Sequence, residues 1–308
     1  MSVFLDFDST ITVEDTVSQL ADFALRFHRR RDQDGHISTH DGPSTSSTSV
    51  LDGGQDRDLS SRWNDVVRAY MTDHQAHVST YTPRPEDRQT VEAEIAFLHS
   101  LRPLEMKSLA RIDACALFRS IGRDVLREAG RELVRDGSVR LRPGFTDFVR
   151  AALVKGWRVH VVSVNWSAAF IEGACGFAEG EVDVFANEVR EGDGAVRGPS
   201  EELLNEGWDG RNITNSLDKR DVVRAVMRMR DLKGKPLLYF GDSTTDLECL
   251  LEASRGVVMA DDEGSTLMKT LRRIGKRVPH ARDADGNDDL IWVSNFEELM
   301  ARSEIYLE

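Results

Sequence analysis

The chain has 308 residues, of which 40% are hydrophobic, and a formal charge of −13 at pH 7. This length and apolar content suffice for one large domain with a sizeable insertion. No apolar run is long enough for a membrane span, and from the first residues we expect no secretion signal. The negative charge repels phosphate backbones, so we expect no nucleic acid partner. Because no apolar run is long enough to span a bilayer, we also expect no membrane partner.

The three cysteines, Cys115, Cys175 and Cys249, are odd in number and far apart in the sequence. They form neither a Cys-x-x-Cys metal pair nor a disulfide framework. We therefore expect a reducing, cytoplasmic compartment.

The chain begins with a short apolar segment, Val3 to Phe7, which runs into Asp-Ser-Thr. It is too short for a helix and indicates a buried strand that ends in a polar loop. The stretch from Val13 to Asp136 then has the periodicity of helices. Apolar stripes of helical spacing include Val17-Leu20-Ala21-Ala24, Trp63-Val66-Val67-Tyr70, Val91-Ile95-Leu98 and Val125-Leu126-Ala129-Leu133. We expect residues 13–136 to form a helical insertion and residues 1–12 with 137–308 to form the core.

Inside this insertion, residues 31–60 are mostly serine, threonine, glycine, aspartate and other polar residues. Such a segment buries too little apolar surface to offset its ordering entropy. It is predicted to be a disordered loop, either a plain insertion or a regulatory or docking segment.

Four further apolar segments follow the insertion. They are Arg158 to Ser163, Pro236 to Gly241, Gly256 to Ala260 and Leu290 to Val293. Because segments of helical spacing separate them, the sequence predicts an α/β domain with a parallel sheet.

Carboxylates follow two of the predicted strands. Asp6 and Asp8 lie at the end of the first strand, and Asp242 and Asp246 follow the strand that ends at Gly241. At the carboxyl edge of a parallel sheet these groups would meet in one crevice and repel one another unless a hard divalent cation lay between them, and Mg²⁺ fits best. The alternative is that they are ordinary loop and helix-cap residues.

Two further residues are weaker candidates. Ser163 ends a predicted strand just before a helix, where phosphate binds readily but a cap residue is more common. Lys219 lies at the start of a predicted helix, where a positive charge opposes the helix dipole.

In their order along the chain, Asp6-x-Asp8-x-Thr10, the strand ending in Ser163, Lys219 and Gly241-Asp242-Ser243-x-x-Asp246 resemble the four motifs of the haloacid dehalogenase (HAD) superfamily. The resemblance implies a Rossmann-like, doubly wound parallel sheet with a helical cap inserted after the first motif.

The resemblance also implies roles for these residues. Asp6 would attack phosphorus and form an aspartyl-phosphate, and Asp8 would act as general acid and base. Phosphate-binding residues would be Thr10, Ser163, Asn165 and Lys219. Ligands of Mg²⁺ would be Asp6, the backbone carbonyl of Asp8, and Asp242, with Asp246 close by. The expected activity is hydrolysis of a small phosphorylated metabolite, and the oligomeric state stays open.

Several features are similar to particular branches of the superfamily. Asp8-Ser9-Thr10, Glu14-Asp15 and Leu141-Arg142-Pro143-Gly144 resemble phosphoserine phosphatases, whereas Ala186-Asn187-Glu188 and Gly241 to Leu247 resemble methylthioribulose-pathway phosphatases and thiamine monophosphate phosphatase domains. The glycines usual after the strand serine are replaced by Val164-Asn165-Trp166. Trp166 could stack on a ring-bearing substrate or pack at the helix start.

Other interpretations also remain. A phosphonatase or dehalogenase shares the nucleophile, although a dehalogenase needs no second aspartate such as Asp8, and a non-catalytic protein that binds metabolites or partners can share the fold. Arg111, Arg119 and Arg123 could bind a second anionic group of the substrate, but we expect them on a solvated helix face.

Overall fold

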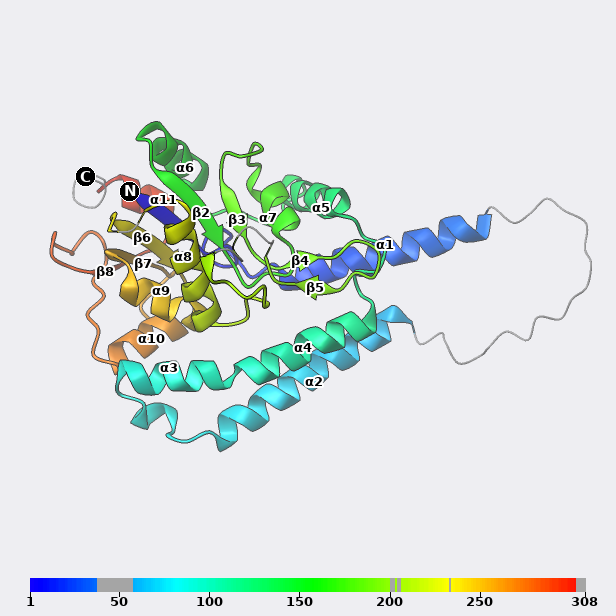
Figure 1. Cartoon of the computed structure of the whole chain (residues 1–308), viewed down its shortest axis with the longest axis horizontal. Coiled ribbons are helices and arrows are strands. Elements are labelled where there is room, and N and C mark those ends of the chain that lie inside the picture. Colours follow the sequence, from blue (N-terminus) through cyan, green and yellow to red (C-terminus); the bar gives the residue numbers. More distant parts are fainter. Residues whose placement is uncertain (38–57, 200–202, 204–205, 233, 303–308) are drawn as a thin grey trace, which may run out of the picture.

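The computed structural model describes residues 1–37, 58–199, 203, 206–232 and 234–302 (Figure 1). Its centre is a six-stranded, fully parallel sheet of order β3-β2-β1-β6-β7-β8. The strands are β1 (Ser2–Leu5), β2 (Arg158–Val162), β3 (Asp183–Phe185), β6 (Leu237–Gly241), β7 (Arg255–Met259) and β8 (Leu290–Val293). From the central β1 the chain winds outward in both directions, which confirms the predicted α/β, doubly wound sheet.

Two apolar cores lie on the two faces of this sheet. In β1, Val3 and Leu5 belong to one core and Phe4 to the other, as the alternation of side chains along a strand requires. The first core also takes up α6 (Phe145–Val154), α7 (Ala168–Cys175) and α11 (Phe296–Met300). The second takes up α8 (Ser216–Met229), α9 (Leu247–Glu252) and α10 (Thr266–Arg273). Burial on both faces explains why the strands read as continuous apolar runs.

The predicted strand positions hold with small shifts at their ends. The last strand has the predicted bounds, whereas β1 ends at Leu5, two residues before the predicted end. The sequence analysis did not predict β3 or the antiparallel pair β4 (Glu188–Val189) and β5 (Val196–Arg197). These strands have only two or three residues and include charged side chains, so they lack a readable pattern.

Helices fill the described part of the chain between β1 and α6. They are α1 (Val17–Ile37), α2 (Leu59–Thr80), the 3₁₀ turn η1 (Pro85–Asp87), α3 (Val91–Ser100), α4 (Arg102–Cys115) and α5 (Arg123–Arg135). Helix α5 ends at Arg135, shortly before Gly137, whose φ of 82° suits the left-handed conformation common after a helix end. The division into a core and a cap at residues 13 and 136 stays a prediction.

The prediction of a disordered loop over residues 31–60 was wrong at both ends. Helix α1 continues to Ile37 and α2 begins at Leu59, while residues 38–57 lie outside the described residues. Packing of Leu20, Ala21 and Ala24 anchors the start of α1 in the first core. A helix anchored in this way can continue through residues such as arginine and glutamine, whose helix propensity is high.

Helices α2 and α4 lie side by side (Figure 1). Helix α3 packs on the second core through Phe97 and Leu98, whereas α4, which follows it, packs on the first core through Leu109 and Ile112. Polar contacts connect α3 and α4 to the core at three points. Two are the ion pairs of Glu94 with Arg273 (2.6 Å) and of Asp113 with Arg197 (2.7 Å), and the third is the hydrogen bond between His99 and Glu248 (2.8 Å). The inserted helices therefore have defined contacts with the rest of the protein. Among the described residues, no helix is both long and apolar enough to cross a membrane.

Candidate active site

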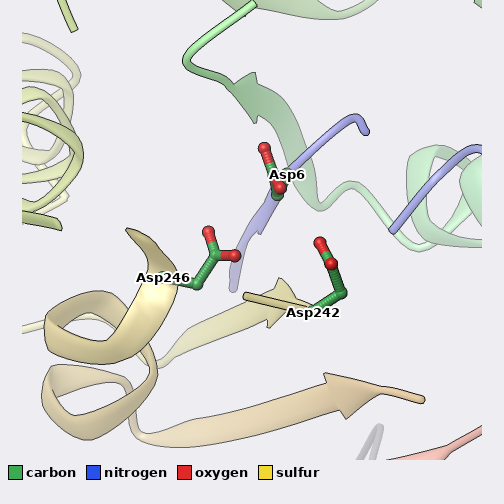
Figure 2. Close-up of side chains that lie close together, drawn as sticks. All are labelled: Asp6, Asp242 and Asp246. Carbon is green, nitrogen blue, oxygen red and sulfur yellow. The ribbon is translucent and has the colours of Figure 1, made fainter. Parts of the chain in front are cut away.

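Three carboxylates from separate segments meet at the carboxyl edge of the sheet (Figure 2). Asp6 directly follows β1, and its backbone N–H donates to the carbonyl of Phe240 in β6 (2.9 Å). Asp242 follows β6, and Asp246 ends the 3₁₀ turn η3 (Thr244–Asp246). Each offers an oxygen, and these oxygens all lie within 4.8 Å of one another. The sheet order explains the cluster, because β1 and β6 are neighbours and their ends coincide.

Lys219 lies at the centre of this carboxylate cluster. Its side chain is fully buried, and Nζ lies 2.7 Å from Oδ1 of Asp6 and 2.7 Å from Oδ1 of Asp246. Burial alone would favour the neutral amine, but the carboxylates of Asp246 and Asp6 raise the pKa of Lys219. These ion pairs explain why a lysine is accommodated near the N-terminus of α8, against the helix dipole.

Local structure fixes the position of Asp246. Its carboxylate accepts hydrogen bonds from the backbone N–H of Ser243 (3.2 Å) and the hydroxyl of Tyr239 (2.7 Å). Gly241 makes room for it, because a Cβ at that position would lie 2.4 Å from the Cβ of Asp246. A side chain at residue 241 would therefore displace the carboxylate.

The charges of the cluster are not balanced by protein groups alone. Burial and the neighbouring Asp246 raise the pKa of Asp6 well above its usual value, and the same two causes raise the pKa of Asp242 to about 7. Three carboxylates face one ammonium group, which leaves two negative charges when all are ionised. Two charges and a set of hard oxygen ligands fit Mg²⁺, and the residues present therefore suit the implied metal.

Asp8 lies beside this cluster and is held by different partners. Oδ1 accepts hydrogen bonds from the backbone N–H (2.8 Å) and hydroxyl (2.6 Å) of Thr16, and Oδ2 accepts one from Nδ2 of Asn165 (2.9 Å). Burial and the charge of Asp15 raise the pKa of Asp8, while the bonds from Thr16 and Asn165 oppose that rise. Since Thr16 directly precedes α1, the start of the insertion helps to orient Asp8.

The predicted phosphate-binding residues are not all engaged in the same way. The hydroxyl of Thr10 donates to Oδ1 of Asp242 (3.0 Å), so it joins the carboxylate cluster. Ser163 is fully buried, and its Oγ accepts a hydrogen bond from the backbone N–H of Asn165 (3.1 Å). Within the described residues, no hydrogen bond connects Ser163 to the cluster itself.

Arg142 and Asn187 are among the residues near the site that were missed as participants. Arg142 is buried and donates to the carbonyl of Ser9 (2.8 and 3.1 Å), which steadies the loop between Asp6 and Thr10; Ser9 itself has a φ of 56°. Asn187 donates to the carbonyls of Val164 and Ile213 (3.0 Å each).

Both residues lie in motifs that the sequence singled out as branch features. Their hydrogen bonds to loop carbonyls, however, join residues that are distant in the sequence. No pattern along the chain reports such contacts.

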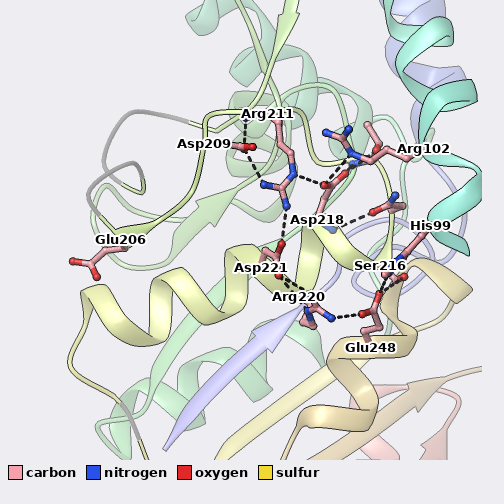
Figure 3. A network of polar contacts seen from close by, with 12 residues as sticks. His99, Arg102, Glu206, Asp209, Arg211, Ser216, Asp218, Arg220, Asp221 and Glu248 are labelled. Atoms are coloured by element: carbon pink, nitrogen blue, oxygen red, sulfur yellow. Dashed lines mark hydrogen bonds and ion pairs between the residues drawn. The ribbon is translucent and has the colours of Figure 1, made fainter. Parts of the chain in front are cut away.

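A network of polar contacts fixes the start of α8, which carries Lys219 (Figure 3). Asp218 is fully buried and accepts a hydrogen bond from Nε of Arg211 (2.7 Å). Glu248 accepts hydrogen bonds from the hydroxyl of Ser216 (2.7 Å) and from His99 of α3 (2.8 Å). The lysine is thus placed by an ordered helix start that is itself connected to the insertion.

The arginines considered as substrate ligands are mostly engaged elsewhere. Arg111 pairs with Asp73 (2.7 Å), and Arg123 pairs with Glu172 and Glu188 (2.5 Å each). Arg119 is exposed. The expected helix-surface role therefore agrees for Arg111 and Arg123, whereas Arg119 lies in the turn between α4 and α5 and not on a helix.

The packing interpretation of Trp166 agrees with the structure, and its stacking on a substrate ring stays a prediction. It is half-buried and packs edge-on against Trp63 and Phe118, with ring centroids 5.9 and 6.0 Å apart. It also lines a cavity of about 440 Å³ next to the site.

With this geometry in place, comparison with known proteins defines the class. Residues 61–251 match the family of haloacid dehalogenase-like hydrolases. This range is more than half of the chain, so the protein belongs to the haloacid dehalogenase-like hydrolase family.

Particular relatives are more distant. The chain is 24% identical over 282 residues to the bifunctional TH2 protein, mitochondrial, of Arabidopsis thaliana, which covers 89% of this chain and 40% of that protein. It is 28% identical over 185 residues to a CTO1 family protein of Schizosaccharomyces pombe, covering 56% of this chain and 64% of that one. The chain therefore spans less than two thirds of the length of both relatives.

A solved structure also aligns over nearly the whole chain. Cytosolic 5′-nucleotidase IIIB bound to cytidine matches with a TM-score of 0.51 and 14% identity, over 99% of this chain and 86% of that one. At this identity the match shows a shared fold.

Proposed function

We propose that the protein is a Mg²⁺-dependent phosphomonoesterase that acts on a small phosphorylated metabolite through an aspartyl-phosphate on Asp6. The observation that supports this most is the pair of 2.7 Å contacts from Lys219 to Asp6 and Asp246, with Asp242 in the same cluster and Asp8 held apart from it. The carboxylate of Asp8 is thereby separated from the three carboxylates of the cluster and is available for proton transfer.

In this proposal Asp6, Asp242 and the backbone carbonyl of Asp8 hold Mg²⁺, with Asp246 at the same cluster. Bound Mg²⁺ supplies charge neutralisation for the phosphoryl oxygens. Lys219 contributes positive charge at the same place and orients the carboxylate of Asp6. Ser163, Thr10 and Asn165 complete the proposed phosphate-binding set.

The reaction divides into two displacements. The Asp6 carboxylate attacks phosphorus, the bond from phosphorus to the leaving oxygen breaks, and Asp8 gives its proton to that oxygen. Asp8 then takes a proton from a water molecule, whose oxygen attacks the phosphorus of the aspartyl-phosphate and releases phosphate and the free Asp6 carboxylate. The raised pKa of Asp8 suits this role, since the group must carry a proton in the first step.

Location and substrate belong to the proposal as well. We propose a reducing, cytoplasmic compartment, because Cys115, Cys175 and Cys249 are odd in number and far apart in the sequence. The Arabidopsis relative is mitochondrial by name, and cell fractionation distinguishes the two locations. Phosphoserine, a methylthioribulose-pathway intermediate and thiamine monophosphate are the substrates to try first.

The test is a panel of phosphometabolites and p-nitrophenyl phosphate, assayed with Mg²⁺ and with EDTA. The proposal expects turnover that needs Mg²⁺ and disappears in Asp6→Asn. Asp22→Asn, an exposed residue of α1, is the matched control and should keep full activity.

Two results would contradict the proposal. Turnover that survives Asp6→Asn would exclude the nucleophile. A wild type that is inactive on every phosphomonoester but active on a phosphonate or haloacid, or that only binds metabolites, would favour the other members of the superfamily.

A further inference from the structure

A cavity of about 440 Å³ lies between the inserted helices and the core. Its walls come from α2, α4, the start of α1 and the loops that precede α7 and α8. The residues that bear on its chemistry are Trp63, Tyr70, Glu105, Trp166 and Asp15. The volume is in the range of small-molecule sites, and most of the lining surface is apolar.

The cavity lies near the residues that hold the proposed general acid, although Asp8 itself does not line it. Asp15 and Val17 line it and flank Thr16, while Val164 and Trp166 line it and flank Asn165. Thr16 and Asn165 are the two residues that hold the carboxylate of Asp8. A leaving group that accepts a proton from Asp8 would therefore extend into this cavity.

The charges around the cavity have one sign. Among the described residues that line it are two carboxylates, Asp15 and Glu105, and no lysine, arginine or histidine. Oε1 of Glu105 accepts a hydrogen bond from the hydroxyl of Tyr70 (3.0 Å), and the described residues provide no partner for Oε2. Burial raises the pKa of Glu105, as it does for a carboxylate that lacks a cation.

Aromatic rings complete the cavity. Trp63 and Trp166 meet edge-on, and Tyr70 is half-buried one helical turn further along α2 than Val66, which also lines the space. Rings of this kind bind the flat face of another ring and attract a cation. A second anion on the leaving group would instead face Glu105 and Asp15 without a compensating charge.

We propose, on the basis of the phosphatase function above, that this cavity is the leaving-group subsite. It selects phosphomonoesters whose leaving group carries a flat ring with a positively charged or N–H-donating nitrogen. Glu105 is the specificity-determining residue, because its free oxygen accepts the hydrogen bond from that nitrogen. Trp63 and Trp166 enclose the ring.

The test compares esters that differ in one group at a time. These are 4-(aminomethyl)phenyl phosphate, phenyl phosphate and 4-carboxyphenyl phosphate, with 2-aminoethyl phosphate as a cation without a ring. We expect kcat/KM to fall in the order cationic ring, neutral ring, anionic ring, and to be low for the cation without a ring. Each variant is compared with the wild type on the same ester, so intrinsic differences in reactivity cancel.

Glu105→Gln should lower the preference for the cationic over the anionic ring by about tenfold or more, because it removes a charge-assisted hydrogen bond. Turnover of phenyl phosphate should change little. Glu128→Gln, an exposed glutamate of α5, is the matched control and should leave the preference unchanged. Tyr70→Phe keeps the ring and should keep the preference, which shows that the carboxylate carries it.

A binding measurement separates this inference from the proposed function. Benzylammonium should quench tryptophan fluorescence in the wild type and at least tenfold more weakly in Glu105→Gln, whereas benzoate should not bind. If no ester is hydrolysed but benzylammonium binds in this way, the phosphatase proposal fails and the subsite stands. If esters are hydrolysed but Glu105→Gln leaves the order of preference unchanged, the subsite proposal is overturned and the phosphatase stands.

Discussion

The carboxylate cluster and the cavity beside it are built on different principles. The cluster consists of charged groups at the ends of β1 and β6 and at the start of α8. Its ion pairs and hydrogen bonds restrain the positions of these side chains. The cavity consists mainly of apolar and aromatic side chains from α2 and α4, with a carboxylate oxygen that no described residue binds. We therefore expect the two regions to have different roles. Changes in the cluster should lower the rate for every substrate, and changes in the cavity should alter the order of preference among substrates.

The first prediction concerns Asp8. Asp8→Asn keeps the shape of the side chain but cannot transfer a proton, so kcat should fall by about 10²- to 10⁴-fold for every ester. Because loss of the acid matters least for good leaving groups, the fall should be smaller for p-nitrophenyl phosphate than for an alkyl phosphate. Steady-state kinetics on both esters measures this. Equal losses on both would argue that Asp8 only positions other groups.

The second prediction concerns the buried lysine. Lys219→Met leaves Asp6 and Asp246 without their shared cation, and we expect the free energy of unfolding to fall by about 3–5 kcal/mol in EDTA. Urea unfolding measures the change. Saturating Mg²⁺ should restore part of the loss, since the cation replaces the missing charge. A variant as stable as the wild type in EDTA would show that Lys219 does not stabilise the buried carboxylates of Asp6 and Asp246.

The third prediction tests the fit between β6 and Asp246. Gly241→Ala places a Cβ 2.4 Å from the Cβ and Cγ of Asp246, so the carboxylate must move. We expect a stability loss of about 1–3 kcal/mol together with a weaker Mg²⁺ affinity. Gly137→Ala is a contrasting control: nothing lies within 4 Å of the added Cβ, so any stability loss there reflects the φ of 82° and should leave Mg²⁺ affinity unchanged.

The sequence predicted the carboxylate cluster better than the cavity, because several cluster residues lie at recognisable positions along the chain. Asp6, Asp242 and Lys219 could be found because each lies at a strand end or helix start within a recognisable spacing. Thr16 and Tyr239 were missed because their hydroxyls act through contacts with Asp8 and Asp246 that only the folded chain creates.

The cavity was harder still to predict. Trp63, Val66 and Tyr70 lie on one face of a helix, as their spacing in the sequence predicted. This spacing does not distinguish residues that pack in a core from residues that line a cavity. The short strands and the end of α1 were missed for a related reason, since their positions depend on packing against neighbours and not on local composition.

The last prediction is a pH dependence of the apo protein, which builds up gradually over several pH units. The pKa of Asp242 is about 7 in the fold against 3.8 for the free group, and that of Asp6 is also raised, so the folded state binds protons more tightly than the unfolded state. In EDTA, stability should therefore fall as pH rises from about 4 to 7, by on the order of 1 kcal/mol per pH unit for each group. Thermal unfolding across this range measures it.

Excess Mg²⁺ should offset this loss increasingly as the pH rises, because it competes with protons for the same carboxylates. Asp242→Asn should have a shallower slope in EDTA than the wild type. A stability that is independent of pH in EDTA would mean that the carboxylates are not buried together as described.

The most direct measurement is to trap the covalent intermediate. The protein is mixed with an ester that it hydrolyses and with Mg²⁺, then reduced with borohydride, which converts an aspartyl-phosphate into homoserine, and digested for peptide mass spectrometry. The account predicts homoserine at position 6, dependent on both ester and Mg²⁺ and more abundant in Asp8→Asn, where the second displacement is slowed. Homoserine at another aspartate, or an unmodified Asp6 during rapid turnover, would contradict it.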